Sequence, residues 1–237
     1  MIRIENLTKK YKDVTAVDNL NLSVGRGELF SLLGVNGAGK TTTIKMLSCL
    51  IQPTDGDAFL NGKSIITESA DVKRMIAVSP QETAVANGLS VRENLELMCG
   101  VHGFTKEKKN RKIAELTELL GLLPVLGKKA GKLSGGWQRR LSIAMALISE
   151  PEILFLDEPT LGLDVLVRSD LWELIRSLKG KVTIVLTTHY MEEAEALSDR
   201  IAIMKNGSCD SADKIKEAAG ADDFEQAFVR LVKGESK

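Results

Sequence analysis

Residues 34–41 of this chain, GVNGAGKT, constrain its fold more than any other feature of the sequence. They fit the pattern G-x-x-x-x-G-K-[ST], in which a glycine-rich loop wraps the phosphates of a nucleotide. The apolar stretch 29–33 precedes the loop and is expected to form a buried strand, and residues 42–50 are expected to form a helix. A strand, a glycine loop and a helix in this order predict a nucleotide site in an α/β fold.

The chemistry of such a loop explains which residue types it needs. Glycines let consecutive backbone N–H groups turn toward the β-phosphate, and the following helix carries about half a positive charge at its N-terminus. Lys40 brings a cation to the β- and γ-phosphates, and the Thr41 hydroxyl is suited to bind Mg²⁺. The residues expected to bind ATP here are Gly34, Val35, Asn36, Gly37, Ala38, Gly39, Lys40, Thr41 and Thr42.

The composition excludes several other classes of protein. The 237 residues include 32 Lys plus Arg and 32 Asp plus Glu, so we expect no nucleic-acid binding through bulk positive charge. Three widely spaced cysteines, Cys49, Cys99 and Cys209, argue against a disulfide framework and favour a reducing compartment. We find no signal peptide and no apolar run of about 20 residues, so we expect a cytoplasmic protein.

Periodicity and turn signals suggest how the rest of the chain is organised. Residues 2–33 alternate between apolar and polar side chains and are expected to form short strands. Asn-Gly pairs at 61–62 and 206–207 predict tight hairpin turns, so an antiparallel sheet is expected beside the nucleotide core. The continuous apolar runs 153–156 and 182–186 are typical of strands in a parallel sheet.

Helical patterns dominate residues 82–150. Residues 90–93, SVRE, match a capping box at the start of one helix. The basic run 106–112 begins a second helix, and we interpret it as a solvated face. Apolar residues at helical spacing within 224–231 predict a further, C-terminal helix that docks on the core.

Two short segments in this framework have the chemistry of a nucleotide site. Asp157 and Glu158 follow the strand predicted at 153–156, where a carboxylate can hold Mg²⁺ and its neighbour can polarise an attacking water. Residues 133–136, LSGG, precede a helical stretch at 137–149. They therefore place a second anion-binding helix N-terminus in the same chain.

The order and spacing of these motifs resemble the ATP-binding subunit of an ATP-binding cassette (ABC) transporter, over nearly the whole chain. The matching motifs are the P-loop 34–41, Gln81 within 79–82, the signature 133–136, the Walker B segment 153–158, the D-loop residues Leu163 and Asp164, and the switch histidine His189. The resemblance implies an α/β fold: a P-loop NTPase (RecA-like) core with a parallel sheet, an antiparallel β subdomain and an inserted α-helical subdomain. The core would comprise residues 1–81 and 151–212, the helical subdomain 82–150, and a C-terminal helical tail 213–237.

The resemblance also assigns roles to single residues. Tyr11 would stack on adenine, and Glu158 and His189 would be catalytic, with His189 contacting the γ-phosphate. Gln81 would also report to a membrane partner. The Mg²⁺ ligands would be Thr41, Gln81 and Asp157, the last directly or through a water.

The same resemblance implies partners. Ser134, Gly135, Gly136 and Asp164 would contact the nucleotide held by a second ATPase subunit, giving a head-to-tail pair, expected to be a homodimer, with two ATP molecules between its members. Multispanning permease subunits would cross the membrane, and this chain would lie on its cytoplasmic face. ATP binding would close the pair and hydrolysis would open it.

One residue departs from the family pattern. Trp137 follows the second signature glycine, where glutamine is common, and an apolar residue there resembles the subunits of ABC-2-type exporters. We expect Trp137 to lie near the face on which two subunits pair. Two alternatives to an exporter subunit remain open: a soluble ABC-family ATPase, such as a cluster-assembly ATPase, and a nucleotide-regulated binding module without turnover. The presence of Glu158 and His189 disfavours the second alternative.

Overall fold

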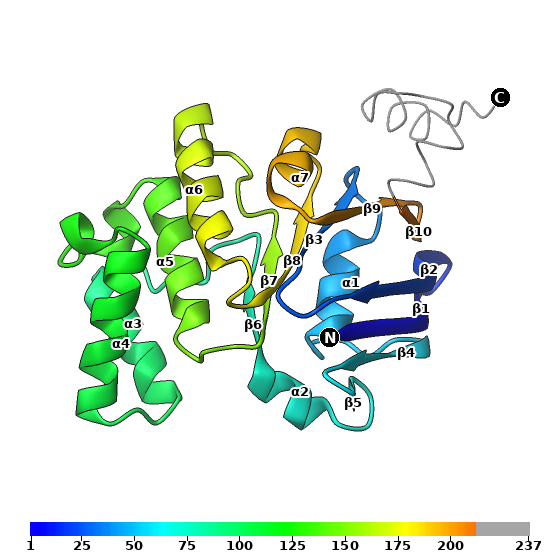
Figure 1. Ribbon diagram of the computed structural model, residues 1–237, viewed down its shortest axis with the longest axis horizontal. Coiled ribbons are helices and arrows are strands. Elements are labelled where there is room, and N and C mark those ends of the chain that lie inside the picture. The colour runs from blue at the N-terminus through cyan, green and yellow to red at the C-terminus, as the bar shows by residue number, and fades with distance from the viewer. Residues whose placement is uncertain (212–237) are drawn as a thin grey trace. The chain divides into compact units, whose positions relative to one another are not determined.

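The computed structural model describes residues 1–211, which fall into two compact units. The first unit comprises Met1–Arg74 and the described residues from Lys179 onward, and the second comprises Met75–Leu178. Figure 1 labels their helices and strands. The C-terminal helix expected within 224–231, and the tail 213–237 that contains it, lie outside the described residues.

Parallel strands form the centre of the first unit. The strand β3 (Leu29–Gly34) is buried along its whole length and pairs in parallel with β8 (Thr183–Thr188) on one side and β9 (Arg200–Lys205) on the other. The strand β10 (Ser208–Ser211) continues this sheet, antiparallel to β9. The predictions of buried strands at 29–33 and 182–186 are confirmed, although β8 begins one residue later and runs two residues further.

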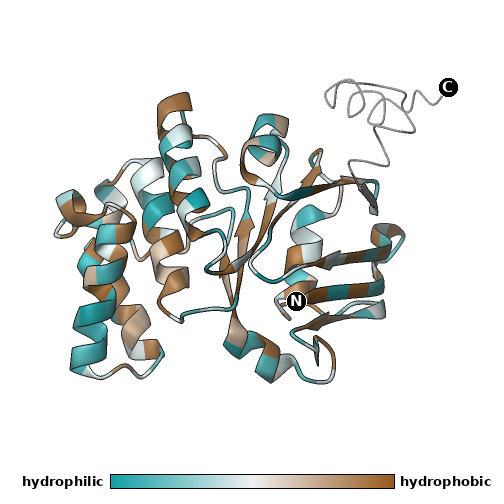
Figure 2. Cartoon of the chain, viewed as in Figure 1, coloured by the Kyte–Doolittle hydropathy of each residue, from teal (hydrophilic) through white to brown (hydrophobic). Residues whose placement is uncertain are grey.

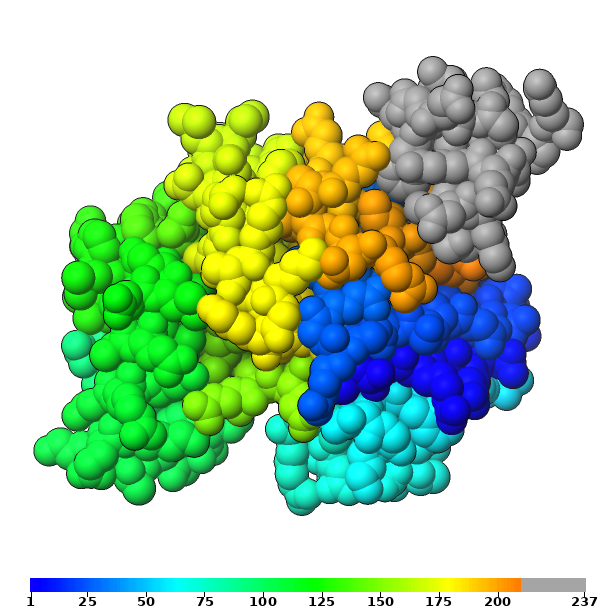
Figure 3. All heavy atoms as spheres, in the orientation of Figure 1, coloured from blue at the N-terminus to red at the C-terminus, as the bar shows by residue number. Residues whose placement is uncertain are grey.

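An antiparallel sheet accompanies these strands in the first unit, as predicted. Its order is β2 (Val14–Val24), β1 (Ile2–Tyr11), β4 (Asp55–Leu60) and β5 (Lys63–Ser64). The Asn-Gly pairs 61–62 and 206–207 join β4 to β5 and β9 to β10, and all four residues have positive φ, as the tight hairpin turn requires. Figure 3 shows the dark blue atoms of β1 beside the cyan segment that contains β4.

The prediction of short strands within residues 2–33 is wrong for β1 and β2, which have 10 and 11 residues. Their pairing shifts register at several points, and both Asn6 and Asn19 adopt positive φ. The Asn21 side chain accepts a hydrogen bond from the Asn6 N–H at 2.9 Å, and Thr8 Oγ1 accepts one from the Asn19 N–H at 3.0 Å. These bulges interrupt the two-residue alternation, so a continuous strand has the sequence pattern of several short ones.

The second unit contains a parallel strand pair and four longer helices. The strands are β6 (Ile76–Ser79) and β7 (Ile153–Asp157). The helices are α3 (Val91–Val101), α4 (Lys106–Leu119), α5 (Gly135–Leu147) and α6 (Val165–Leu178). Buried side chains on α5, including Leu141 and Ile143, pack it against its neighbours, whereas α4 has a hydrophilic outer face (Figure 2). The capping box predicted at 90–93 is present, with both of its hydrogen bonds.

Shorter elements complete the described residues 1–211. The helix α1 (Lys40–Leu47) contacts β2 and β3, and α7 (Met191–Leu197) contacts β3 and β8. The helix expected at 42–50 is shifted: it starts at Lys40, directly after its N-cap Gly39, and ends before Ser48, whose hydroxyl donates a hydrogen bond to Ile44 O. Likewise α5 begins at Gly135, two residues before the predicted 137–149. The remaining elements are α2 (Ser69–Met75) and the 3₁₀ turns Leu123–Val125 and Ala130–Lys132.

Candidate nucleotide site

The glycine loop lies between β3 and α1 and is shaped by a close approach of neighbouring backbone. Gly39 is the N-cap of α1 and has φ 108°. A Cβ at this position would lie 2.3 Å from the carbonyl oxygen of Ala16 in β2, so no other residue fits. The first turn of α1 contains no acidic side chain. The loop therefore presents a helix N-terminus to an anion without a nearby carboxylate on that turn to repel it.

The Lys40 side chain contacts the glycine loop, as two hydrogen bonds show. Its side chain is almost fully buried, with 5% exposure. Its Nζ donates hydrogen bonds to Gly34 O at 2.6 Å and to Val35 O at 3.2 Å. The hydroxyl-bearing residues Thr41 and Thr42 follow in the first turn of α1 and are half-buried. The loop thus combines a cation, a helix N-terminus and hydroxyl groups, the chemistry that binds a triphosphate.

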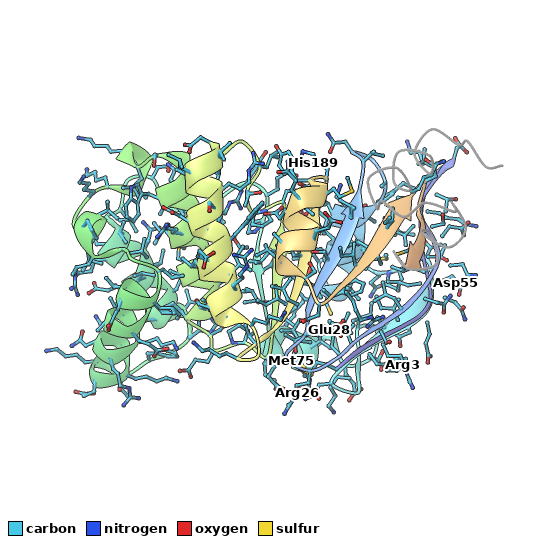
Figure 4. The ribbon with its side chains drawn as sticks, turned by 45° about the horizontal axis from the view of Figure 1, so that its top comes forward. Arg3, Arg26, Glu28, Asp55, Met75 and His189 are labelled. Atoms are coloured by element: carbon cyan, nitrogen blue, oxygen red, sulfur yellow. The ribbon has the colours of Figure 1, made fainter. Side chains whose placement is uncertain are left out.

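His189 leaves the sheet at the same edge as this loop. Leu33 and Thr188 are paired in the parallel register of β3 and β8, so Gly34 and His189 follow at neighbouring strand ends. Figure 4 shows His189 at the opposite end of these strands from Glu28, which precedes β3. The His189 ring lies 4.0 Å from that of Tyr190, between ring centroids. The carboxyl edge of a parallel sheet is where ligands bind in open α/β folds.

Tyr11 comes from the hairpin that touches the loop. It ends β1, is 45% exposed, and has the Lys9 ammonium 5.2 Å from its ring centroid. The return strand of the same hairpin contains Ala16, whose carbonyl constrains Gly39. Tyr11 therefore offers an accessible aromatic surface on an element in contact with the loop.

In the second unit, Gln81 and the acidic pair also follow neighbouring strand ends. Ser79 of β6 and Leu156 of β7 are paired in parallel, so Gln81 lies just beyond one strand and Glu158 just beyond the other. Asp157 and Glu158 are 4% and 5% exposed, and Glu158 has φ 48°. A left-handed backbone at a non-glycine residue costs about 1–3 kcal/mol and tends to occur at functional sites.

The signature residues form the N-terminus of α5. Ser134 is the exposed N-cap, and within the described part of the chain its side chain makes no capping hydrogen bond. Asp164 does cap its own helix, because its Oδ1 accepts a hydrogen bond from the Val167 N–H at 3.0 Å. The sequence expectation of a helix N-terminus at the signature is confirmed, with the Ser134 hydroxyl not used to cap it.

The two signature glycines differ in what surrounds them. A Cβ on Gly136 would lie 2.3 Å from Cγ1 of Val167 in α6, far inside contact distance. A Cβ on Gly135 would lie 3.5 Å from Cδ2 of Leu163, an ordinary contact. Gly136 is therefore needed for the close packing of α5 on α6, whereas no such contact explains Gly135.

We expect Gly136→Ala to lower the free energy of unfolding by about 1–3 kcal/mol, because the added methyl overpacks the contact with Val167. Urea unfolding would measure it. Gly100→Ala in α3 is the matched control: no described atom outside that helix's own backbone lies within 4 Å of a Cβ there, so it should stabilise by about 0.5–1 kcal/mol. Adding Val167→Ala should remove most of the Gly136→Ala effect. Equal effects of the two alanine substitutions would contradict the packing role.

Sequence reasoning missed several residues of this site. Arg139 and Ser142 of α5 contact the segment that ends in Gln81, and Val167 contacts Gly136. No sequence signal identified them, since they lie in ordinary helical stretches.

Trp137, which follows the second signature glycine, is half-buried, and the guanidinium carbon of Arg140 lies 5.4 Å from the centroid of its ring.

The structure thus gathers the predicted residues in two sets, each within one unit. The first unit holds Tyr11, the loop 34–42 and His189. The second holds Gln81, Asp157, Glu158, Ser134, Gly135, Gly136 and Asp164. Among residues 1–211, no three His, Cys, Asp or Glu side chains gather to hold a metal ion by themselves. The predicted Mg²⁺ ligands Thr41, Gln81 and Asp157 offer the oxygen donors that Mg²⁺ prefers alongside nucleotide phosphates.

A glycine loop between a buried parallel strand and a helix, with acidic residues at another strand end, defines a P-loop nucleotide-binding fold. The chain belongs to the ABC transporter family, whose pattern it matches over residues 17–161.

Two curated relatives are similar over most of this chain. It is 38% identical to the probable multidrug ABC transporter ATP-binding protein YbhF of Escherichia coli, over 98% of this chain and 42% of that protein. It is 40% identical to the daunorubicin resistance ATP-binding protein DrrA3 of Streptomyces coeruleorubidus, over 93% of this chain and 71% of that protein. The chain therefore spans less than half of the length of YbhF.

Solved structures agree with the fold. An ATP-binding subunit of an ABC transporter superposes with a TM-score of 0.84 at 28% identity, covering 98% of this chain and 99% of that one. A dimeric ATP-binding cassette in a post-hydrolysis state, bound to ADP and Pi, superposes with a TM-score of 0.79 at 28% identity, covering 89% and 98%. No helix within residues 1–211 has the length and apolar character needed to cross a membrane.

Proposed function

We propose that this chain binds and hydrolyses ATP as a subunit of a membrane ABC transporter of the ABC-2-like exporter type, on the cytoplasmic face. The observation that carries the proposal is that motif glycines begin two helices in separate units, α1 after the glycine loop and α5 at the signature. Such helix N-termini are suited to binding phosphate groups. The names of two relatives support an exporter: YbhF is a probable multidrug ABC transporter ATP-binding protein, and DrrA3 is a daunorubicin resistance ATP-binding protein.

In this proposal, each residue set has a defined task. Lys40 and the N–H groups of the loop bind the β- and γ-phosphates, and Tyr11 stacks on adenine. Thr41, Gln81 and Asp157 hold Mg²⁺, which neutralises charge on the phosphate oxygens. Glu158 accepts a proton from the attacking water, and His189 donates to the γ-phosphate as charge develops there.

The signature serves a second copy of the chain. Ser134, Gly135, Gly136 and Asp164 complete the site around the nucleotide bound by the loop of that copy. Two observations support this assignment: the Ser134 hydroxyl does not cap α5, and no close packing contact accounts for Gly135. Pairing and separation of the two subunits then move multispanning permease subunits, with Gln81 as the residue that faces them.

The test is Ser134→Arg, which should leave ATP binding by the single subunit unchanged but prevent ATP-driven pairing. The long cationic side chain fills the space that the second nucleotide needs, while the loop 34–42 is untouched. Fluorescent ATP-analogue binding and sizing chromatography with ATP measure the two effects. Ser177→Arg on α6, also exposed, is the control and should pair normally. Loss of single-subunit binding by Ser134→Arg would contradict the assignment to a second copy.

A further inference from the structure

The arginine at position 139 has a buried position that no recognised motif explains. It lies on α5, one turn after the signature, and is 5% exposed. Its Nη1 donates a hydrogen bond to Pro80 O at 2.6 Å, and its Nη2 donates one to Gln81 O at 2.5 Å. The two terminal nitrogens of one guanidinium therefore hold two consecutive carbonyls at the end of β6.

The contact between the Arg139 guanidinium and these two carbonyls fixes the orientation of the main chain at residues 80–81. A buried guanidinium is destabilising unless it is hydrogen-bonded, and its planar fork holds the groups that it contacts in one orientation. One turn further along α5, Ser142 Oγ lies 2.9 Å from Ser79 Oγ, and both residues are buried. One face of α5 thus makes hydrogen bonds to each of the three consecutive residues from Ser79 to Gln81.

The N-terminus of this helix, one turn before Arg139, carries the signature. Ser134 caps α5, and the first turn of the helix is packed tightly on α6 through Gly136 and Val167. A helix moves as a rigid element, so a displacement at Ser134 is carried to Arg139 within the same two turns. The first two turns of α5 therefore join the signature to the Gln81 loop, through the hydrogen bonds that Arg139 makes one turn after the signature.

We propose that Arg139 is a positioning residue that couples the signature helix to Gln81. It holds the main chain of Gln81 so that the side-chain amide is aimed at Mg²⁺, and it makes the loop follow α5 when the second subunit engages the signature. This inference rests on the proposed function, because it uses Gln81 as a Mg²⁺ ligand and Ser134 as a contact to the second nucleotide.

The experiment compares Arg139→Met with Arg140→Met. Arg140 is the neighbouring arginine on α5, and its contacts are Leu120 O, Asp170 and the Trp137 ring rather than the Gln81 loop. In a Glu158→Gln background with saturating ATP, Mg²⁺ is titrated and pairing is followed by sizing chromatography. Arg139→Met should need at least about tenfold more Mg²⁺ for half-maximal pairing, whereas Arg140→Met should stay near the parent. Arg139→Lys can reach one carbonyl and should be intermediate.

A second measurement does not depend on pairing. Hydrogen exchange at amides 82–86 of the nucleotide-free protein should be faster in Arg139→Met than in the parent, and unchanged in Arg140→Met. Equal Mg²⁺ dependence for Arg139→Met, Arg139→Lys and the parent would overturn the proposal and leave Arg139 a packing residue. If Arg139→Met does not fold, Arg139→Lys decides the question. Failure of the parent itself to pair at any Mg²⁺ concentration would instead count against the proposed function.

Discussion

Glu158→Gln should bind ATP as tightly as the wild type but lose turnover by about 100-fold or more, the range expected when a general base is removed. Its paired form should accumulate with ATP, since the phosphate contacts that hold the pair are no longer removed. An amide matches the carboxylate in size and can still hydrogen-bond, yet it accepts a proton poorly. Phosphate release and sizing chromatography measure the two effects.

The backbone conformation at Glu158 explains why Glu158→Gln should change only the chemistry of the side chain. Its φ of 48° and its 5% exposure show that the position is set by the surrounding fold, and glutamine has the same backbone requirements. Glu152→Gln is the control, because Glu152 precedes the same strand β7 but is exposed. Turnover of Glu158→Gln within about threefold of the wild type would remove Glu158 from the role of base.

Lys40→Ala should weaken ATP binding by at least about 1.5–3 kcal/mol, the typical value of a hydrogen bond to a charged group. The substitution deletes the ammonium that now contacts Gly34 O and Val35 O and that is aimed, in our proposal, at the β- and γ-phosphates. Titration with a fluorescent ATP analogue gives the affinity directly.

The control for this loss is a lysine on the same helix. Lys45 lies in the last turn of α1 and is exposed, so Lys45→Ala removes the same charge away from the loop. It should change the affinity for ATP little. Unchanged affinity in Lys40→Ala, or an equal loss in both variants, would contradict the assignment of the loop.

Local sequence signals predicted the elements that depend on local physics. The strand before the loop, the capping box at Ser90 and both Asn-Gly turns are confirmed because each is determined by residues close together in the chain. The lengths of β1 and β2 were wrong because Asn6 and Asn19 form bulges, whose hydrogen bonds come from residues on other segments.

The contacts that tie the second unit together could not be predicted in this way. Arg139 and Pro80 are 59 residues apart in the sequence, and nothing in the helical pattern of α5 distinguishes Arg139 from Arg140. The distance between Gly136 and Val167 depends on how closely two helices approach. Motifs therefore identified the residues expected to meet the nucleotide, whereas the residues that position them required the packing.

The central claim, that two copies of this chain complete each other's ATP sites, is tested most directly by mixing two inactive variants. Lys40→Ala lacks a working loop and Ser134→Arg lacks a working signature, so neither alone forms a complete site. A mixed pair joins the intact loop of one subunit to the intact signature of the other, and so rebuilds one of its two composite sites. The account predicts that ATP hydrolysis and ATP-driven pairing, absent from each variant alone, return in part on mixing, through the one rebuilt site. No recovery on mixing, or full activity of Ser134→Arg alone, would contradict it.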